Sequence, residues 1–490
     1  MTAELLARLG GPAGGLGLAL LVLAPTRALK LAGLALLAVG AALFVPFLTP
    51  SEGQVLIAGS AALAGVLAVA LAALFVRYPW SLAFLALAAV PARVPISVGD
   101  VSASLLVPLY AVVAGAAVAL AWRLVREGNE TRGRELGRVS WPLALVVLWV
   151  GLSTLWTIDL ERGAVQLFFF VLPFGLLAVA LARLPWSERG LAWLYRLLAA
   201  MAVLFAAVGA WQWVTKDVFW NPRVEAWNTF GPFVRVNSLF WDPSMYGRFL
   251  VVAIVTSVVL LLFQPSARRD LAIGGAVVVL WIGLVFSFSQ SSFVALMAGV
   301  GLVAVLAWRW RAVVAIAAIA ALMVPVGFAS PAFDDVGDAV ASGSEDRLNR
   351  ATSGRLVIVE NGLRIAADHP VLGVGVGGFR DAYADEAGLA REPEGGVSHT
   401  TPLTLAAETG VIGLALFAWL LAAAFLAALR GNRAGADVAG RAKIAAGDAL
   451  AAIAFHSLFY NAFFEDPMTW GLLALTALAG RALRRDDHAV

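Results

Sequence analysis

Residues 330–401 form one long polar stretch between apolar runs, and they carry the side chains best suited to chemistry. The stretch contains Arg355, His369, the glycine-rich run 373–378 and His399. Arginine binds phosphate oxygens in pairs and stays charged at any relevant pH. A neutral imidazole can accept a proton near pH 7. We therefore expect anion binding and proton transfer to be combined here.

Further polar candidates lie in short segments between other apolar runs. They are Arg235, Asp242, Gln290, Glu408, Glu465 and Asp466. Competing explanations stay open for the two arginines, because Arg235 could be a snorkelling residue and Arg355 a residue of a solvated helix. His369 precedes Pro370 and is expected to orient the loop rather than react, whereas Glu408 is only a weak candidate to orient His399.

The glycine-rich run GVGVGG, which includes Gly375, does not fit a dinucleotide site. No β-strand is expected before it and no βαβ unit surrounds it, so the structural context of that motif is missing. A tight loop that lets the backbone approach a lipid head group and a plain turn are equally good explanations. The acidic residues upstream, from Asp334 to Asp346, lack the spacing of a calcium loop. We predict no cofactor and no required metal.

The composition identifies a membrane protein. Of 490 residues, 61% are hydrophobic and only 14% are charged, and the mean hydropathy is +0.86. That is more apolar surface than one soluble core could bury. The absence of cysteine excludes disulfides and thiolate metal sites. A net charge of +3 gives no support for nucleic-acid binding.

The apolar runs predict an all-α fold, a polytopic bundle of about 12 to 14 transmembrane helices with a large extracytoplasmic helical loop. An additional run at 16–24 is expected to be an interfacial or re-entrant segment rather than a cleaved signal. The candidate spans are 28–48, 54–76, 79–92, 101–122, 141–157, 164–182, 191–214, 243–263, 271–288, 292–307, 312–328, 402–428, 446–463 and 470–482.

Charge asymmetry predicts the orientation. Alternate loops hold clusters of arginine, for example at 123–138, 268–269 and 430–443, and such loops stay in the cytoplasm. The stretch 329–401 holds twelve Asp or Glu against six Arg, so we place it outside. The predicted organisation is N-terminal membrane helices (1–328), an extracytoplasmic catalytic loop (329–401), and C-terminal membrane helices with a cytoplasmic tail (402–490). All candidate site residues then face the same external side.

Three segments resemble the O-antigen ligase and O-antigen polymerase superfamily of bacterial membrane enzymes, over roughly the last 260 residues. His399-Thr400, nine residues and Gly410-Val-Ile-Gly413 are similar to the family's histidine motif. SGRLVIVENGLRIAADHPVLGVGVGGF and RVNSLFWDPSMYGRFL resemble its loop segment and an upstream Asp-Pro segment. Thr400 and Ser244 depart from the commonest residues, and Gln290 replaces an arginine of many relatives.

The resemblance implies a GT-C-like glycosyltransferase of the bacterial cytoplasmic (inner) membrane with a periplasmic active site. It would move a glycan from an undecaprenyl diphosphate carrier to an acceptor hydroxyl, in O-antigen ligation or polysaccharide polymerisation. The partners implied are a lipid-linked oligosaccharide or polysaccharide donor, a glycan or glycolipid acceptor and membrane lipids. Arg235 and Arg355 would hold the diphosphate and His399 would be the base. Substrate contacts would come from His369, Asp242, Gln290, Gly375, Glu408, Glu465 and Asp466.

Two other classes remain open. A polytopic transporter or lipid-linked glycan flippase would have as many spans, but transporters usually carry ionisable residues or broken helices near the membrane midplane. The central parts of these spans are nearly free of charge. A non-catalytic assembly subunit would not need the arginine and histidine arrangement. Within the enzyme class, ligase and polymerase share the same residues, and the acceptor distinguishes them.

Overall fold

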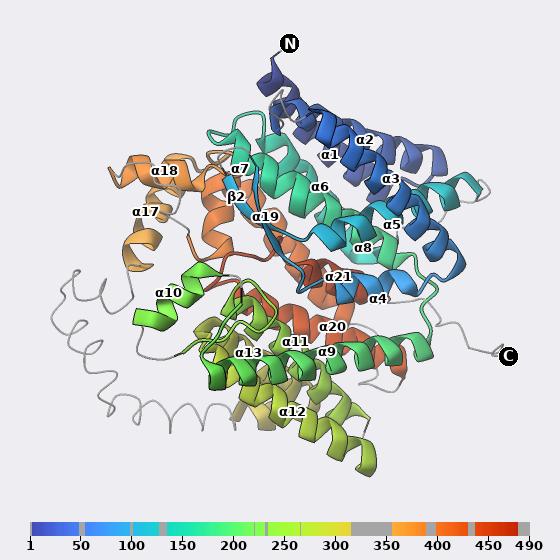
Figure 1. The fold of residues 1–490 in the computed structure, drawn as a ribbon, viewed down its shortest axis with the longest axis vertical. Helices are drawn as coiled ribbons and strands as arrows, with labels where there is room; N and C mark the ends of the chain where they lie inside the picture. The colour runs from blue at the N-terminus through green and yellow to red at the C-terminus, as the bar shows by residue number, and fades with distance from the viewer. Residues whose placement is uncertain are drawn as a thin grey trace.

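A computed structural model describes most of the chain, and the described part is largely helical (Figure 1). The described residues are 2–48, 54–98, 101–126, 135–219, 221–230, 234–264, 266–314, 355–388, 398–429 and 437–478. All but the first three residues of the expected span 312–328 lie outside these ranges, as do residues 330–354 and 389–397 of the polar stretch.

Within the described residues, nine helical segments are long and apolar enough to cross a membrane. About 20 apolar residues span the hydrocarbon core, so the predicted polytopic helical fold is confirmed, while the count of 12 to 14 stays a prediction. The nine are α1 (Ala3–Leu23), α2 (Arg27–Leu48), α5 (Val107–Arg126), the α7–α8 segment (Leu160–Ala182), α9 (Glu188–Thr215), α11 (Pro243–Phe263), α12 (Ala267–Ser287), α13 (Gln290–Trp308) and α19 (Thr401–Leu429).

Other helices complete the described structure. Two expected spans are reduced to short helices, 79–92 to α4 (Ser81–Ala88) and 470–482 to α21 (Pro467–Thr476). At 1.5 Å per residue these reach only about 12 and 15 Å. The remaining helices are α3 (Gln54–Arg77), α6 (Ser140–Ser153), α10 (Pro222–Phe230), α17 (Arg355–Asp368), α18 (Phe379–Glu386) and α20 (Val438–His456).

A β-hairpin corrects the purely helical expectation. Strands β1 (Val94–Val98) and β2 (Val101–Leu105) pair antiparallel, with Val94 opposite Leu105, and α5 begins only at Val107. The span expected from residue 101 therefore starts six residues later. The sequence signal was the run of β-branched residues around the short Gly99-Asp100 connection, which is typical of a hairpin.

The run at 16–24 is not a separate interfacial piece, because it is the second half of α1. Helix α1 packs closely along α2 and α6 through glycines. A Cβ on Gly17 would lie 2.7 Å from the carbonyl oxygen of Gly33, and one on Gly11 would lie 2.7 Å from that of Gly151. Small residues let membrane helices approach this closely, so the N-terminal helix belongs to the bundle.

The helices define two ends of the bundle. The end called here the site end contains α10, α17, α18 and the start of α11 (Figure 1). The opposite end contains the starts of α9, α12 and α20 and carries many arginines. There Glu135 forms ion pairs with Lys30 and with Arg183, the latter at 2.9 Å, and all three side chains are at most 5% exposed. This buried triad ties α2 to α8.

Candidate functional site

Segments that are far apart in the sequence meet at the site end. They are the loop before α11, the turn between α12 and α13, the start of α17, the start of α19, and the turn between α20 and α21 (Figure 1). The predicted trio of Arg235, Arg355 and His399 lies on three of them. The charge of Arg355 acts on both Arg235 and His399, so the structure brings the trio together.

Arg235 is held in place by hydrogen bonds of its own backbone and of its side chain. Its N–H donates to Asn228 Oδ1 and its carbonyl accepts from Asn228 Nδ2, both at 2.9 Å, which ties the loop to α10. Arg235 Nε donates to the carbonyl of Ser287, at the end of α12, at 3.4 Å. Burial lowers the pKa of Arg235; Asp242 opposes that shift and Arg355 adds to it. Arginine still remains charged at neutral pH.

His399 precedes α19 in a left-handed backbone conformation with φ of 53°. Its neighbours fix the turn, because the Ser398 hydroxyl bonds to that of Thr404 and the N–H of Thr401 donates to the carbonyl of Ser457 at 2.8 Å. Burial lowers the pKa of His399, the charge of Arg355 lowers it further, and Asp242 partly offsets both. The imidazole is therefore neutral at pH 7, which is the form that accepts a proton.

Asp242 lies among these charged groups. It affects the pKa of Arg235, His399 and Tyr460. The same carboxylate caps α11, since Oδ1 accepts from the N–H of Ser244 at 2.7 Å. An N-cap aspartate is favoured because it satisfies a free N–H at the positive end of the helix. The cap thus fixes a negative charge beside the predicted base.

Two further arginines reach the same region and were missed from the sequence. Arg93, just before the hairpin, donates from Nη2 to the carbonyl of Glu465 at 2.9 Å. Arg248, in α11, pairs through Nε with Asp466 Oδ2 at 2.7 Å. Its Nη1 is buried and finds no hydrogen-bond partner among the described residues. A buried donor left unpaired is costly, so Nη1 suits an anionic ligand.

Tyr460 lies between these arginines and the acidic residues. The Arg248 guanidinium is 5.8 Å from the Tyr460 ring, and Arg93, Asp242 and Glu465 also act on its hydroxyl. Burial is the main cause that raises the pKa of Tyr460, so the phenol stays protonated. Burial likewise raises the pKa of Glu465, against the opposing charges of Arg93 and Arg248.

The side chains of Asp466 and Glu408 are buried and bonded to other protein groups. Asp466 is 4% exposed, pairs with Arg248, and caps α21 by accepting from the N–H of Met468 at 2.9 Å. Glu408 is 3% exposed, and its Oε1 accepts from the N–H of Phe379 at 3.4 Å. Glu408 therefore holds the start of α18, which differs from the expected role of orienting His399.

The glycine-rich run docks into a break in α19. Gly410 there is non-helical, with φ of 65°. The N–H groups of Val374 and Gly375 donate to the carbonyls of Ala407 and Glu408 at 2.9 and 2.8 Å. Gly375 has φ of 89°, and a Cβ on it would lie 2.2 Å from Thr157 Cα. The run is thus a packed turn, the second of the two expected explanations.

Two further candidates are exposed, and a third histidine is buried. His369 is exposed and follows α17, and its carbonyl accepts from the N–H of Gly373. Gln290 is exposed at the first position of α13. His456 is fully buried, with Nε2 3.1 Å from Ser291 Oγ. Among the described residues, no group of three His, Cys, Asp or Glu could hold a metal ion.

Comparison with known proteins identifies part of this region. Residues 275–418 match the family model of the O-antigen ligase. This segment is similar to an O-antigen ligase domain. The match confirms the resemblance drawn from the sequence and includes Gln290, Arg355, His399 and Glu408, whereas Arg235 lies upstream. No curated protein matches the chain.

The O-antigen ligase domain and the apolar helices together indicate a multi-pass membrane protein with a glycosyltransferase-type ligase role. Within the chain, the ligase domain supplies α13, α17, α18 and the start of α19. Segments outside the domain contribute further charged groups, namely Arg93 before the hairpin, Arg235 in the loop before α11 and Arg248 in α11.

Proposed function

We propose that this protein is a glycosyltransferase that moves a glycan from an undecaprenyl diphosphate carrier to a hydroxyl of an acceptor glycan or glycolipid. The observation that supports this most directly is that Arg235, Arg355 and His399 lie on segments that meet at the site end, where the charge of Arg355 lowers the pKa of both other residues. Cations for a diphosphate and a neutral base are thereby combined in one region. The proposal extends the ligase role of the matched domain to a carrier and a mechanism.

In the proposed reaction Arg235 and Arg355 bind the diphosphate oxygens. The acceptor oxygen attacks the anomeric carbon, the bond from that carbon to the diphosphate oxygen breaks, and the acceptor proton passes to His399. The two bonding electrons leave with the diphosphate, whose growing charge the guanidinium groups stabilise. A single displacement of this kind inverts the anomeric centre. The arginines provide the charge stabilisation without a metal.

The surroundings add two supporting contacts. Tyr460 acts electrostatically on Arg235, and Arg248 lies 5.8 Å from the Tyr460 ring, so we propose that both bind remaining phosphate or sugar oxygens. Arg93 is tied through Glu465 to the turn before α21, so it is pre-positioned. Fixed donors cost less to organise than mobile ones when charge develops in a reaction. Residues 329–401 are proposed as the extracytoplasmic catalytic loop between the two sets of membrane helices.

The backbone hydrogen bonds at the break in α19 argue against a transporter. Broken helices in transporters expose free backbone groups to a substrate cavity. Here the carbonyls of Ala407 and Glu408 are occupied by Val374 and Gly375, and the N–H of Val411 donates to the carbonyl of Pro370 at 2.8 Å. The break serves to hold the loop.

The test is transfer in vitro with purified protein, a lipid-diphosphate-linked glycan and candidate acceptor glycans. Arg235→Lys and Arg355→Lys should each reduce transfer strongly at unchanged protein level, because lysine keeps the charge but cannot bind two oxygens at once. His369→Ala, at an exposed loop position, is the matched control and should cost far less. Full transfer by Arg355→Lys would count against the diphosphate role.

A further inference from the structure

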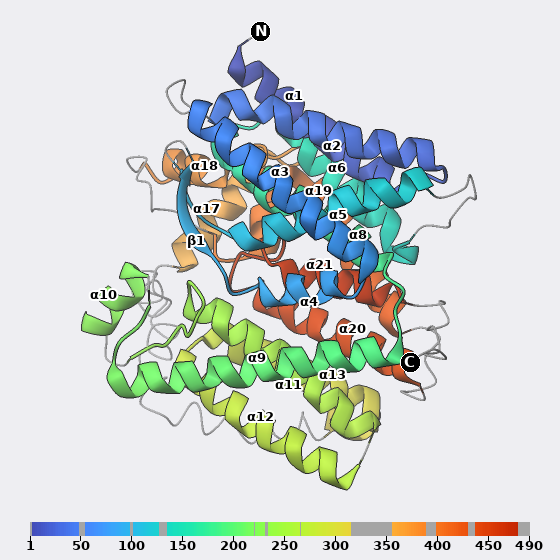
Figure 2. The ribbon, with the colours of Figure 1, turned by 45° about the vertical axis from the view of Figure 1, so that its right-hand side comes forward.

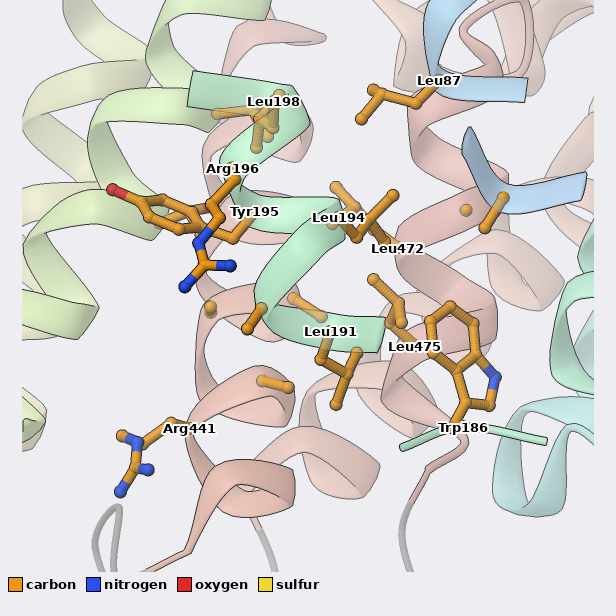
Figure 3. A pocket seen from close by; sticks show the side chains of 18 of the residues that line it. Leu87, Trp186, Leu191, Leu194, Tyr195, Arg196, Leu198, Arg441, Leu472 and Leu475 are labelled. Atoms are coloured by element: carbon orange, nitrogen blue, oxygen red, sulfur yellow. The ribbon is translucent and has the colours of Figure 1, made fainter. Parts of the chain in front are cut away.

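A half-enclosed groove lies apart from the site, on the inner face of α9. Figure 2 shows α9 running across the molecule below α4, and Figure 3 shows the groove from close by. It encloses about 650 Å³ and is bounded by α4, α8, α9, α11, α20 and α21. That volume falls within the roughly 300–1,000 Å³ of ligand pockets. The groove is thus large enough for an acyl chain.

The walls of the groove are apolar. Leu191, Leu194 and Leu198 of α9 face Leu472 and Leu475 of α21 across it (Figure 3). These leucines are one or two helical turns apart on their helices, so each helix lines the groove with one face. Tyr195 also lines this stretch, and its hydroxyl is 3.1 Å from Ser257 Oγ.

The groove is about as deep as one leaflet of a bilayer. On α11 its lining runs from Val252 to Gln264. At 1.5 Å per residue this is about 18 Å, compared with about 15 Å for half of the hydrocarbon core. A single-leaflet lipid chain fits this depth.

One end of the groove is strongly basic. Its lining includes four arginines, Arg189, Arg196, Arg269 and Arg441, and one acid, Glu188. Glu188, Arg189, Arg269 and Arg441 lie near the starts of α9, α12 and α20, at the end opposite the site, and Arg196 lies two turns further along α9. Arg269 Nη2 lies 3.6 Å from Asp270 Oδ1, whereas its Nε finds no hydrogen-bond acceptor among the described residues. Arg196 lies over the Trp193 ring at 4.6 Å, an arrangement suited to the membrane interface.

We propose that this groove binds an anionic glycerophospholipid of the cytoplasmic leaflet. One acyl chain lies between α9 and α21, and the phosphate lies at the arginine rim, where paired hydrogen bonds are available. Basic pockets between helices on the cytoplasmic side of membrane proteins bind anionic head groups in this way. The ligand is distinct from the glycan donor, whose diphosphate belongs at the other end of the bundle.

Native mass spectrometry of the full-length protein in detergent, with equal amounts of phosphatidylglycerol and phosphatidylcholine, tests the proposal. The wild-type protein should retain phosphatidylglycerol about tenfold more than phosphatidylcholine, since charge-assisted bonds of this kind are worth about one power of ten or more. Arg189→Gln with Arg269→Gln should abolish that preference. Arg268→Gln, an exposed neighbour that does not line the groove, should leave it intact.

Gly471→Leu tests the groove itself without touching the rim. A Cβ on Gly471 would meet only Leu181 Cδ1, at 3.9 Å, so the added side chain enters the groove without a backbone clash. Retention of both lipids should fall several-fold. The proposal is overturned if the wild-type protein shows no head-group preference, if Arg268→Gln loses it equally, or if Gly471→Leu retains both lipids fully.

Discussion

Variants of the buried pair Arg248 and Asp466 distinguish a structural role of Arg248 from a role in binding the diphosphate. Their side chains are 3% and 6% exposed and their closest atoms are 2.7 Å apart. Arg248→Met leaves the carboxylate buried and unpaired, which typically costs about 3–5 kcal/mol. Asp466→Asn leaves the guanidinium unpaired at a similar cost, but its Oδ1 can still cap α21. Each single variant should therefore unfold at a clearly lower temperature in detergent.

The double variant Arg248→Met/Asp466→Asn removes both charges and keeps the cap. Most of the lost stability should return, because removing a whole buried pair is often nearly neutral. If Arg248 Nη1 also contacts the diphosphate, transfer should stay low in this refolded variant. Thermal unfolding and transfer, measured on the same four proteins, give the double-mutant cycle. Additive losses of stability would refute the pairing, and full transfer by the double variant would refute the phosphate contact.

Two further predictions concern pH and orientation. The acidic limb of kcat/KM should lie below the usual histidine pKa of 6.5, since burial and Arg355 lower the pKa of His399 and activity is lost only as pH falls through that lowered value. Arg355→Gln should move the limb to higher pH and Asp242→Asn to lower pH; shifts in the same direction would contradict the assignment. In this cysteine-free chain, an impermeant thiol reagent on intact cells should label Glu386→Cys and spare Arg268→Cys. The reverse pattern would place the site end in the cytoplasm.

The membrane helices could be predicted from the sequence because long apolar runs have few alternatives in a bilayer. The exceptions were segments whose structure depends on neighbours. The run at 16–24 extends back to Ala3 as a helix that packs on Gly33 and Gly151. Residues 101–105 pair with β1 instead of continuing α5. Apolarity alone does not distinguish a short strand from a helix start.

The site was predictable in part. Arg235, Arg355 and His399 could be grouped because all three lie on the side opposite the arginine-rich loops. They also lie in segments that resemble the family. Arg248 was missed because it lies within an apolar span, although an isolated charge there is itself a signal of function. The capping role of Asp466 and the loop contact of Glu408 depend on tertiary neighbours, which single-sequence patterns do not specify.

The central claim is that His399 is the general base of an inverting transfer. The decisive measurement is single-turnover transfer by His399→Ala, with the anomeric configuration of the wild-type product determined in parallel by NMR. The account predicts a loss of about 10² to 10⁴ in rate, donor binding close to wild type and an inverted product. Near wild-type turnover by His399→Ala, or a product that retains the donor configuration, would contradict it.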